Sequence, residues 1–261
     1  MANEKKTVTA ALIIIGNEIL SGRTHDKNLP HIAKTLGDVG VRLTEARVIP
    51  DIEAEIIDAV NTLRAKYDYV FTTGGIGPTH DDITAECVAK AFGLKLIQNP
   101  EARRRMAERS AETGTELNEA RLRMANAPEG ATLIDNPISA APGFRVENVH
   151  VMAGVPQIMR AMLDGVKDGL AGGARVMSKT VLCTLGEGTV ASGLGDIQKK
   201  YPEVDIGSYP QYNRGQYRVS LVLRATEADM LDAATDEVAD LVRDLGGDPD
   251  IRDGDDSKDD A

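Results

Sequence analysis

The sequence has no tryptophan, three phenylalanines and two cysteines among its 261 residues. This shortage of aromatic rings argues against a large stacking platform for a ligand. Cys87 and Cys183 lie far apart, without metal-ligand spacing, so we interpret them as reduced core thiols of a cytoplasmic protein. No apolar run reaches the roughly 18 residues of a membrane-spanning helix, and the run that ends at Gly16 is too short for a secretory signal.

The sequence has fewer basic residues than acidic ones. Thirty lysines and arginines stand against 41 aspartates and glutamates, and the net charge is −11. This balance excludes a general nucleic-acid-binding surface, which needs a basic footprint. Residues 246–261 hold seven aspartates against one arginine and one lysine, without apolar periodicity or the spacing of a calcium-binding loop. We predict a disordered acidic tail there.

Residues 1–172 alternate between apolar runs and helical periodicity, which predicts an α/β fold. The expected strands cover residues 8–15, 41–49, 69–72 and 149–152. The expected helices cover residues 29–39, 52–63, 84–92 (with Thr84 as N-cap), 99–109 and 157–169. The alternation indicates a mainly parallel sheet with helices on both faces, whose ligands bind beyond the carboxyl ends of the strands.

Residues 173–245 have a different pattern, which predicts a separate small α+β domain of order βαββα. The strands are expected at residues 177–184, 204–209 and 217–224, with a turn at Asn213-Arg214-Gly215. The helices are expected at residues 191–201 and 227–245.

A glycine-rich loop, Thr73-Gly74-Gly75-Ile76-Gly77, follows the third strand and precedes a helix. Glycines permit positive φ and expose backbone N–H groups that cradle a phosphate near a helix N-terminus, although such loops also serve as plain turns.

Two adjacent carboxylates, Asp81 and Asp82, follow this loop. They repel a phosphate unless a cation bridges them, which favours a divalent metal. The alternative is that both are solvated turn residues, one of them a cap. Glu18 and Asp51 also follow strand ends. We predict that Glu18, Asp51 and Asp82 converge on one Mg²⁺, with Mn²⁺ or Co²⁺ as substitutes.

Several strings together resemble the molybdopterin-binding domain of the MoaB/Mog and CinA type. Residues 73–84, TGGIGPTHDDIT, resemble the CinA-type motif TGGxGPTxDDxT. The other matches are residues 16–22 to GDELLxG, Asp26-Lys27-Asn28 to DxN, Pro50-Asp51 to an acidic loop, residues 136–144 to NPxGTAPGF and residues 153–156 to PGVP. The resemblance covers residues 8–170, and the small domain resembles the one that follows in CinA-type proteins. Their carboxy-terminal deamidase domain is not expected.

Three departures from the family pattern bear on the site. Asn17 stands where the family has aspartate, which removes one acidic charge and lowers the expected metal affinity. Ser139-Ala140 replaces Gly-Thr, which narrows or re-aims the expected ligand crevice, and Ala153 replaces proline.

The resemblance implies a MoaB/Mog-like three-layer fold and a phosphorylated pterin or nucleotide as ligand. It favours a divalent-metal-dependent pyrophosphatase acting on ADP-ribose- or FAD-like substrates. The alternatives are a non-catalytic molybdopterin-binding protein and a regulatory module that docks a partner through its small domain. The expected catalytic residues are Asp82, Asp51 and Asp81, with metal ligands Glu18, Asp51 and Asp82. The expected ligand-binding residues are Thr73, Gly74, Gly75, Gly77, Asn28, Pro142, Gly143, Gly154, Val155 and Pro156.

Some charged residues have competing interpretations. Arg103, Arg104, Arg105, Arg109, Arg121 and Arg123 either reach a phosphate or form a solvated face among glutamates, and the second is favoured. His80 either serves the site or is a solvated loop residue, and again the second is favoured. We expect no nucleic-acid or membrane partner, and a homodimer or homotrimer.

Overall fold

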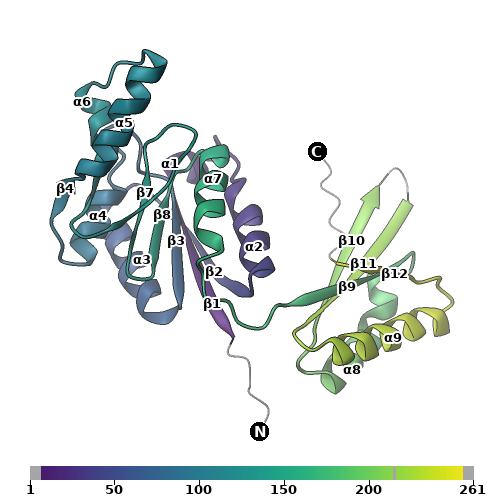
Figure 1. Ribbon diagram of the computed structural model, residues 1–261. Helices are drawn as coiled ribbons and strands as arrows, with labels where there is room; N and C mark the ends of the chain where they lie inside the picture. The colour runs from purple at the N-terminus through teal and green to yellow at the C-terminus, as the bar shows by residue number, and fades with distance from the viewer. Residues whose placement is uncertain (1–6, 214–215, 255–261) are drawn as a thin grey trace, which may run out of the picture. The chain divides into compact units, whose positions relative to one another are not determined.

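The chain divides after Ala174 into two units, Met1–Ala174 (unit 1) and Arg175–Ala261 (unit 2). The computed structural model describes residues 7–213 and 216–254 (Figure 1). The division lies two residues beyond the predicted boundary at residue 172. Arg214 and Gly215 of the predicted turn, and residues 255–261 of the predicted tail, lie outside the described residues.

Unit 1 contains a six-stranded sheet of order β2-β1-β3-β8-β7-β6. The strands are β1 (Val8–Ile15), β2 (Val41–Ile49), β3 (Tyr69–Thr73), β6 (Thr132–Ile134), β7 (Gly143–Val146) and β8 (Val149–Met152). The pairs among β2, β1, β3 and β8 are parallel, whereas β7 and β6 join antiparallel. The predicted mainly parallel sheet is confirmed.

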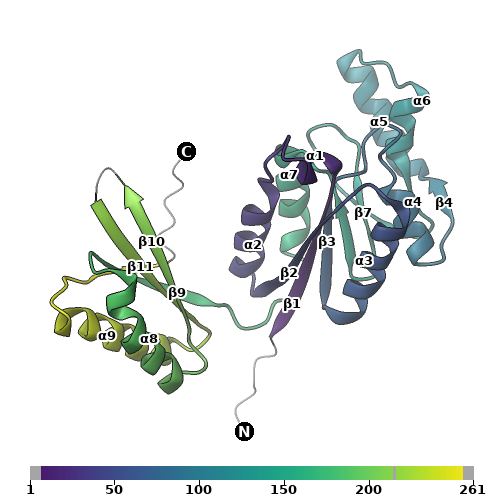
Figure 2. The same cartoon turned by 180° about the vertical axis from the view of Figure 1, so that it is seen from behind.

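Helices cover both faces of this sheet. One face carries α2 (Asn28–Asp38) and α7 (Pro156–Lys167), side by side in Figure 1, and the other carries α3 (Glu53–Lys66) and α4 (Thr84–Ala91) (Figure 2). Leu12 of β1 packs with the α2 and α7 cluster, whereas its neighbour Ile13 packs with the α3 and α4 cluster. Burial on both faces explains why β1 is a continuous apolar run.

A small layer beyond α4 was largely missed from the sequence. It contains the two-stranded ribbon β4 (Leu96–Gln98) and β5 (Asn126–Pro128), with α5 (Pro100–Thr113), α6 (Glu119–Leu122) and the short 3-10 helix η1 (Arg123–Ala125). Only α5 was predicted, and Asn99 caps it by accepting from the N–H groups of Glu101 and Ala102. The other elements are three or four residues long, too short for a periodic signal.

Unit 2 is an antiparallel sheet with two helices, which confirms the predicted small α+β domain. The sheet order is β10-β11-β9-β12. The elements are β9 (Met177–Cys183), α8 (Glu187–Lys200), β10 (Asp205–Asn213), β11 (Gln216–Ala225), α9 (Ala228–Asp244) and β12 (Asp250–Asp253). No helix within residues 7–213 and 216–254 is long and apolar enough to cross a membrane.

The prediction of a disordered tail is wrong for β12. This strand pairs antiparallel with β9, with Ile251 opposite Val181. The Thr180 hydroxyl donates to the Gly254 carbonyl at 2.7 Å. Backbone N–H groups of Gly246 and Gly247 bond back to the last turn of α9, which turns the chain toward the edge of β9. Ladder hydrogen bonds therefore order an acidic segment that composition alone assigns to disorder.

Truncation after Asp248 is expected to destabilise unit 2, because it removes β12 and leaves the β9 edge unpaired. The loss is about 2 kcal/mol, from several hydrogen bonds of about 0.5–1.5 kcal/mol each. A domain of this size loses about 4–8 °C of thermal midpoint per kcal/mol. Truncation after Gly254 keeps β12 and is the matched control. Equal midpoints for the two truncations would show that β12 does not stabilise the sheet.

His150 makes the stability of unit 1 sensitive to acid. It is 2% exposed on β8 and stacks on Phe71 with ring centroids 4.9 Å apart. Burial, and then the charge of Arg145, lowers the pKa of His150 to about 4. The unfolded chain, with a histidine pKa of about 6.5, binds the proton more tightly. Unit 1 therefore loses about 3 kcal/mol of stability as the pH falls from about 6.5 to about 4.

Denaturant titrations across this pH range measure that loss. His150→Phe is expected to remove most of the slope, because a phenylalanine does not titrate, whereas a variant of the exposed His25 is expected to keep it. A slope that is unchanged in His150→Phe would assign the acid sensitivity to other groups.

Candidate functional site

The carboxyl ends of β1, β3 and β8 meet at one edge of the unit 1 sheet, where the glycine loop (residues 73–77) begins. The N–H of Gly74 donates to the Met152 carbonyl at 3.2 Å. Gly74 has a φ of 102°, and a Cβ there would lie 2.1 Å from the Ile15 carbonyl oxygen. A Cβ on Gly154 would lie 3.3 Å from the Gly74 Cα. Only glycine at position 74 allows this approach of strand ends.

The glycine loop is held against the start of α4. The hydroxyl of Thr84 donates to the Gly74 carbonyl at 3.1 Å, and the Thr84 N–H donates to the Gly75 carbonyl at 3.0 Å. The predicted N-cap at Thr84 is therefore wrong: Ile83 occupies that position, and the Thr84 hydroxyl is used on the loop instead. The positive end of the α4 dipole thus faces the glycine loop.

Three consecutive backbone N–H groups of this loop are available to a ligand. Among the described residues, no protein acceptor is hydrogen-bonded to the N–H of Gly75, Ile76 or Gly77. Donors of this kind at a helix N-terminus form an anion cradle. Phosphate binding by this loop remains a prediction from the sequence, and the free N–H groups are compatible with it.

Asp82 combines a structural contact with a place in the site. Its Oδ2 accepts from the Thr79 N–H at 2.8 Å and from the Thr79 hydroxyl at 2.5 Å, which closes the turn before α4. A Cβ on Gly77 would lie 2.6 Å from this oxygen, so the carboxylate lies against the glycine loop. One carboxylate oxygen of Asp82 therefore stabilises the turn, as the alternative interpretation of Asp81 and Asp82 as turn residues expects.

Asp81 is exposed beside it. The nearby Thr79 side chain, whose hydroxyl proton goes to Asp82, and the backbone N–H of Asp81 lower the pKa of the Asp81 carboxyl, with smaller contributions from the charges of His80 and Arg123. A lowered pKa keeps the group ionised and makes it a weaker base than an ordinary aspartate. The His80 side chain is 96% exposed, 4.0 Å from Asp81, in agreement with a solvated loop residue.

Glu18 and Asp51 lie at the ends of β1 and β2. Asp51 Oδ2 accepts from the Asn17 N–H at 2.9 Å, which ties the two strand ends together. The Glu18 carboxylate, on the short helix α1 (Asn17–Leu20), folds back over Gly16, where a Cβ would lie 2.5 Å from both of its oxygens.

The predicted convergence of Glu18, Asp51 and Asp82 on one ready-made metal site is not met. In the described part of the chain, no group of three or more His, Cys, Asp and Glu side chains is gathered closely enough to hold a metal ion. The physical reason is local. Asp51 and Asp82 each use an oxygen on a nearby backbone N–H, which aims the carboxylates at their own loops.

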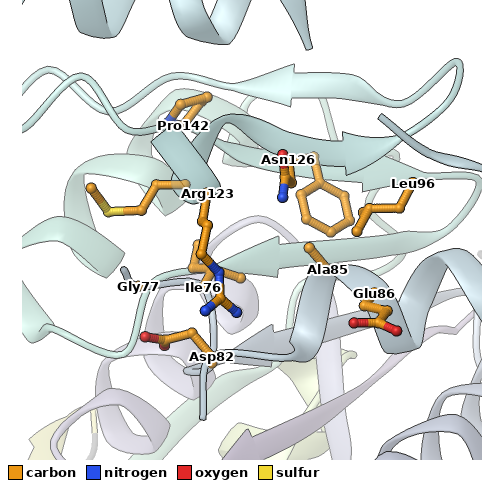
Figure 3. Close-up of a pocket in the computed structure, with 12 residues that line it drawn as sticks. Ile76, Gly77, Asp82, Ala85, Glu86, Leu96, Arg123, Asn126 and Pro142 are labelled. Atoms are coloured by element: carbon orange, nitrogen blue, oxygen red, sulfur yellow. The ribbon is translucent and has the colours of Figure 1, made fainter. Parts of the chain in front are cut away.

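A cavity of about 180 Å³ lies between the glycine loop, α4 and the β4–β5 layer, and we call it the α4 cavity (Figure 3). The predicted site residues that line it are Gly75, Gly77, Asp82 and Pro142. The lining residues that were not predicted as site residues include Leu96, Arg123, Asn126 and Phe144.

Arg123 had been grouped with the solvated arginines. That interpretation is confirmed for Arg104, Arg105 and Arg109, which form ion pairs with carboxylates on or near α5. Arg123 is exposed as well, but it also lines the α4 cavity, so both interpretations of this arginine remain predictions. Within the described residues, no carboxylate lies within 4.0 Å of its guanidinium. The sequence gives no signal that separates Arg123 from the other arginines, because Glu119 stands four residues before it.

Other predicted binding residues hold the crevice in shape. Asn28 is buried at the start of α2 and donates to the Gly154 carbonyl at 2.8 Å. Thr73 is buried at the end of β3. Gly143 is buried in β7, where a Cβ would lie 2.3 Å from the Val151 carbonyl oxygen. Its glycine is thus explained by strand packing.

Two further predicted residues remain accessible at the end of β8. Val155 is 56% exposed, and Pro156 is the first residue of α7. Their place beside Gly154 puts them at the same sheet edge as the glycine loop.

Comparison with known families divides the chain at the same place as the structure. Residues 11–171 match a family described as a probable molybdopterin binding domain. Residues 175–245 match the family described as the middle domain of FAD synthase, rather than a deamidase.

Curated relatives match over most of the chain. A protein of Pyrobaculum calidifontis is 35% identical over 212 residues, which is 78% of this chain and 81% of that protein. A CinA-like protein of Geobacter metallireducens is 34% identical, over 91% of this chain and 60% of the relative. A probable FAD synthase of Caenorhabditis elegans is 31% identical, over 90% of this chain and 50% of the relative. This chain thus spans only part of the last two.

A solved structure of CinA from Thermoplasma acidophilum, a protein described as of unknown function, is also similar. It has a TM-score of 0.57 and 33% identity, and the match covers 62% of this chain and 98% of that one. The chain therefore belongs to the CinA-like branch of the molybdopterin-binding domain family, with a unit like the middle domain of FAD synthase following that domain.

Proposed function

We propose that this protein is a divalent-metal-dependent hydrolase that cleaves the pyrophosphate bond of a nucleotide derivative such as ADP-ribose or FAD. The observation that carries the proposal is the row of N–H groups of Gly75, Ile76 and Gly77, without protein acceptors among the described residues, beside the Asp82 carboxylate. Similarity to a CinA-like protein and to a probable FAD synthase supports a pterin- or nucleotide-related ligand.

Each residue has a defined task in this proposal. The glycine loop binds phosphate oxygens through its N–H groups, and the α4 dipole adds to this attraction. Asp81 stays ionised and orients the attacking water, since its lowered pKa suits a hydrogen-bond acceptor better than a base. Asn28 holds the Gly154 loop at the edge of the crevice.

The donor chemistry of the site fits Mg²⁺. Glu18, Asp51 and Asp82 are not gathered into one cluster, but each carries carboxylate oxygens, the ligands that hard divalent cations take. Mg²⁺ is commonly held by one or two carboxylates together with substrate phosphates, so a ready-made cluster of three is not required. When bound, the ion would offset charge on the leaving phosphate.

The test is a panel of ADP-ribose, FAD and related dinucleotides with Mg²⁺, Mn²⁺ or Co²⁺, scored by release of AMP. We expect AMP only when a divalent metal is present, and none with excess EDTA. No release from any substrate with any of the three metals would contradict the proposal.

The second candidate is a non-catalytic binder of molybdopterin or a related pterin. One observation favours it: the Asp82 and Asp51 carboxylates each use an oxygen on a local backbone N–H. Titration calorimetry beside the turnover assay separates the two functions. Tight pterin binding without release of AMP would support the binder.

A further inference from the structure

The α4 cavity has two chemically different ends (Figure 3). At one end Arg123 reaches toward Asp82 and the loop residue Ile76. At the other end Ala85, in the first turn of α4, faces Leu96, and this end is bordered by Glu86, which pairs with Lys90 at 2.7 Å. Asn126 lies between Leu96 and Arg123. An ionic end beside the glycine loop and an apolar end away from it suit a ligand with a charged part and a ring.

Arg123 forms no close ion pair within the described residues, although its charge contributes to the lowered pKa of Asp81. No carboxylate lies within 4.0 Å of it among the described residues, although Arg104 and Arg105 on the adjacent α5 both pair with Glu101. Its guanidinium presents a planar fork of donors, which matches the oxygens of a phosphate. Because it lines the same cavity as Gly75 and Gly77, a phosphate on the glycine loop lies within its reach.

Asn126 supplies the matching group for a ring. In the described structure its side-chain amide makes no hydrogen bond, and Figure 3 shows it directed into the cavity above Ala85. A side-chain amide carries an N–H donor and a C=O acceptor next to each other. It can therefore form two hydrogen bonds with the edge of a ring that carries an acceptor next to a donor. The apolar faces of Leu96 and Phe144 line the same space.

The size of the cavity limits what enters it. Pockets that enclose a whole drug-sized ligand have volumes of about 300–1,000 Å³. The α4 cavity, at about 180 Å³, holds one part of such a molecule. A fused two-ring heterocycle is a part of that kind, whereas the phosphates remain outside on the glycine loop.

We propose that the α4 cavity binds a purine- or pterin-type two-ring heterocycle, with Asn126 reading the ring edge and Arg123 pairing with a phosphate of the same ligand. The ligand class rests on the proposed function, but the binding does not depend on hydrolysis. For ADP-ribose or FAD, this assigns the adenosine half to the cavity.

The role of Arg123 is tested by calorimetry in EDTA with AMP and with adenosine. Arg123→Met is expected to weaken AMP binding about 10- to 100-fold, the value of charged hydrogen bonds, and to leave adenosine binding unchanged. Arg123→Lys retains the positive charge without the planar pair of donors. Its affinity for AMP is expected to lie between those of wild type and Arg123→Met. Arg121→Met is the matched control, because Arg121 is exposed nearby and bonds to the Glu116 carbonyl.

Asn126→Ala is expected to weaken AMP and adenosine equally, by about tenfold or less. The affinity for GMP is measured beside that for AMP, because guanine shares its 2-amino-4-oxopyrimidine edge with pterins. Tighter binding of AMP assigns the cavity to adenine, and tighter binding of GMP assigns it to a pterin-type ring. Unchanged AMP binding in Arg123→Met, or equal losses for AMP and adenosine in that variant, would overturn the role of Arg123.

Failure of this inference is distinguishable from failure of the proposed function. AMP binding that depends on Arg123, without turnover of any dinucleotide, would remove the hydrolase and leave the cavity assignment intact. Metal-dependent turnover with wild-type kinetics in Arg123→Met and Asn126→Ala would overturn the cavity assignment and leave the hydrolase intact.

Discussion

Asp82→Asn is expected to lower metal-dependent AMP release by about 10²–10³-fold, the scale of losing one electrostatic contact to the reacting group. The fold is expected to be as stable as wild type or slightly more stable. Asparagine can still accept the Thr79 N–H that Asp82 bonds at 2.8 Å, and the repulsion between Asp81 and Asp82 is relieved. Initial rates at saturating metal and the thermal midpoint measure both effects.

Comparison with alanine separates the two tasks of Asp82. Asp82→Ala loses both contacts to Thr79 and is expected to cost about 1 kcal/mol of stability as well as the activity. If Asp51 joins Asp82 on one metal once substrate phosphate is bound, Asp51→Asn is expected to lower activity like Asp82→Asn, and the double variant to be little worse. Asp58→Asn, at an exposed position of α3, is the control. Full activity in Asp82→Asn would reduce Asp82 to a turn former.

Gly74→Ala is expected to destabilise unit 1 by about 3 kcal/mol and to abolish nucleotide binding. Its φ of 102° strains any side chain, and the new Cβ would lie 2.1 Å from the Ile15 carbonyl oxygen, so the loop or β1 must move. At about 2–4 °C per kcal/mol for a unit of this size, the thermal midpoint falls by about 6–12 °C.

Gly22→Ala is the matched control for this variant. Gly22 also has a positive φ, of 73°, but a Cβ there meets nothing within 4 Å. It is expected to cost about 1 kcal/mol through backbone strain alone and to keep nucleotide binding. Similar midpoints and affinities for the two variants would show that close contact of the strand ends does not shape the loop.

The sheet of unit 1 was predictable because its central strands are buried on both faces. The apolar run of residues 8–15 has the same limits as β1. Residues 41–49 have the same limits as β2, although this edge strand is partly exposed along its length. Composition did not predict the strand at residues 250–253, because its formation depends on where the chain lies in the fold. Residues 250–253 pair with β9 because the turn after α9 delivers them to an open sheet edge, which no local pattern reports.

The candidate site was predicted in its backbone and missed in part of its side chains. The glycines at positions 74, 75 and 77 indicate by residue type alone a loop with positive φ and closely approaching backbone. The direction of a carboxylate or a guanidinium depends instead on its neighbours in space. The N–H of Thr79 donates to Asp82, and the N–H of Asn17 donates to Asp51. Arg123 has no such close partner among the described residues and lines the cavity.

The hydroxyl of Thr84 holds the glycine loop through the Gly74 carbonyl, so under the proposed function the phosphate is bound by backbone N–H groups and not by the side chain at position 76. The ring-facing residues Leu96 and Asn126 come from a different stretch of chain, the β4–β5 ribbon. Under this proposal, separate stretches of the chain bind the phosphate and select the ring. If the cavity binds the ring, substitutions in the ribbon are expected to change which heterocycle binds while the glycine loop and the sheet beneath it stay unchanged.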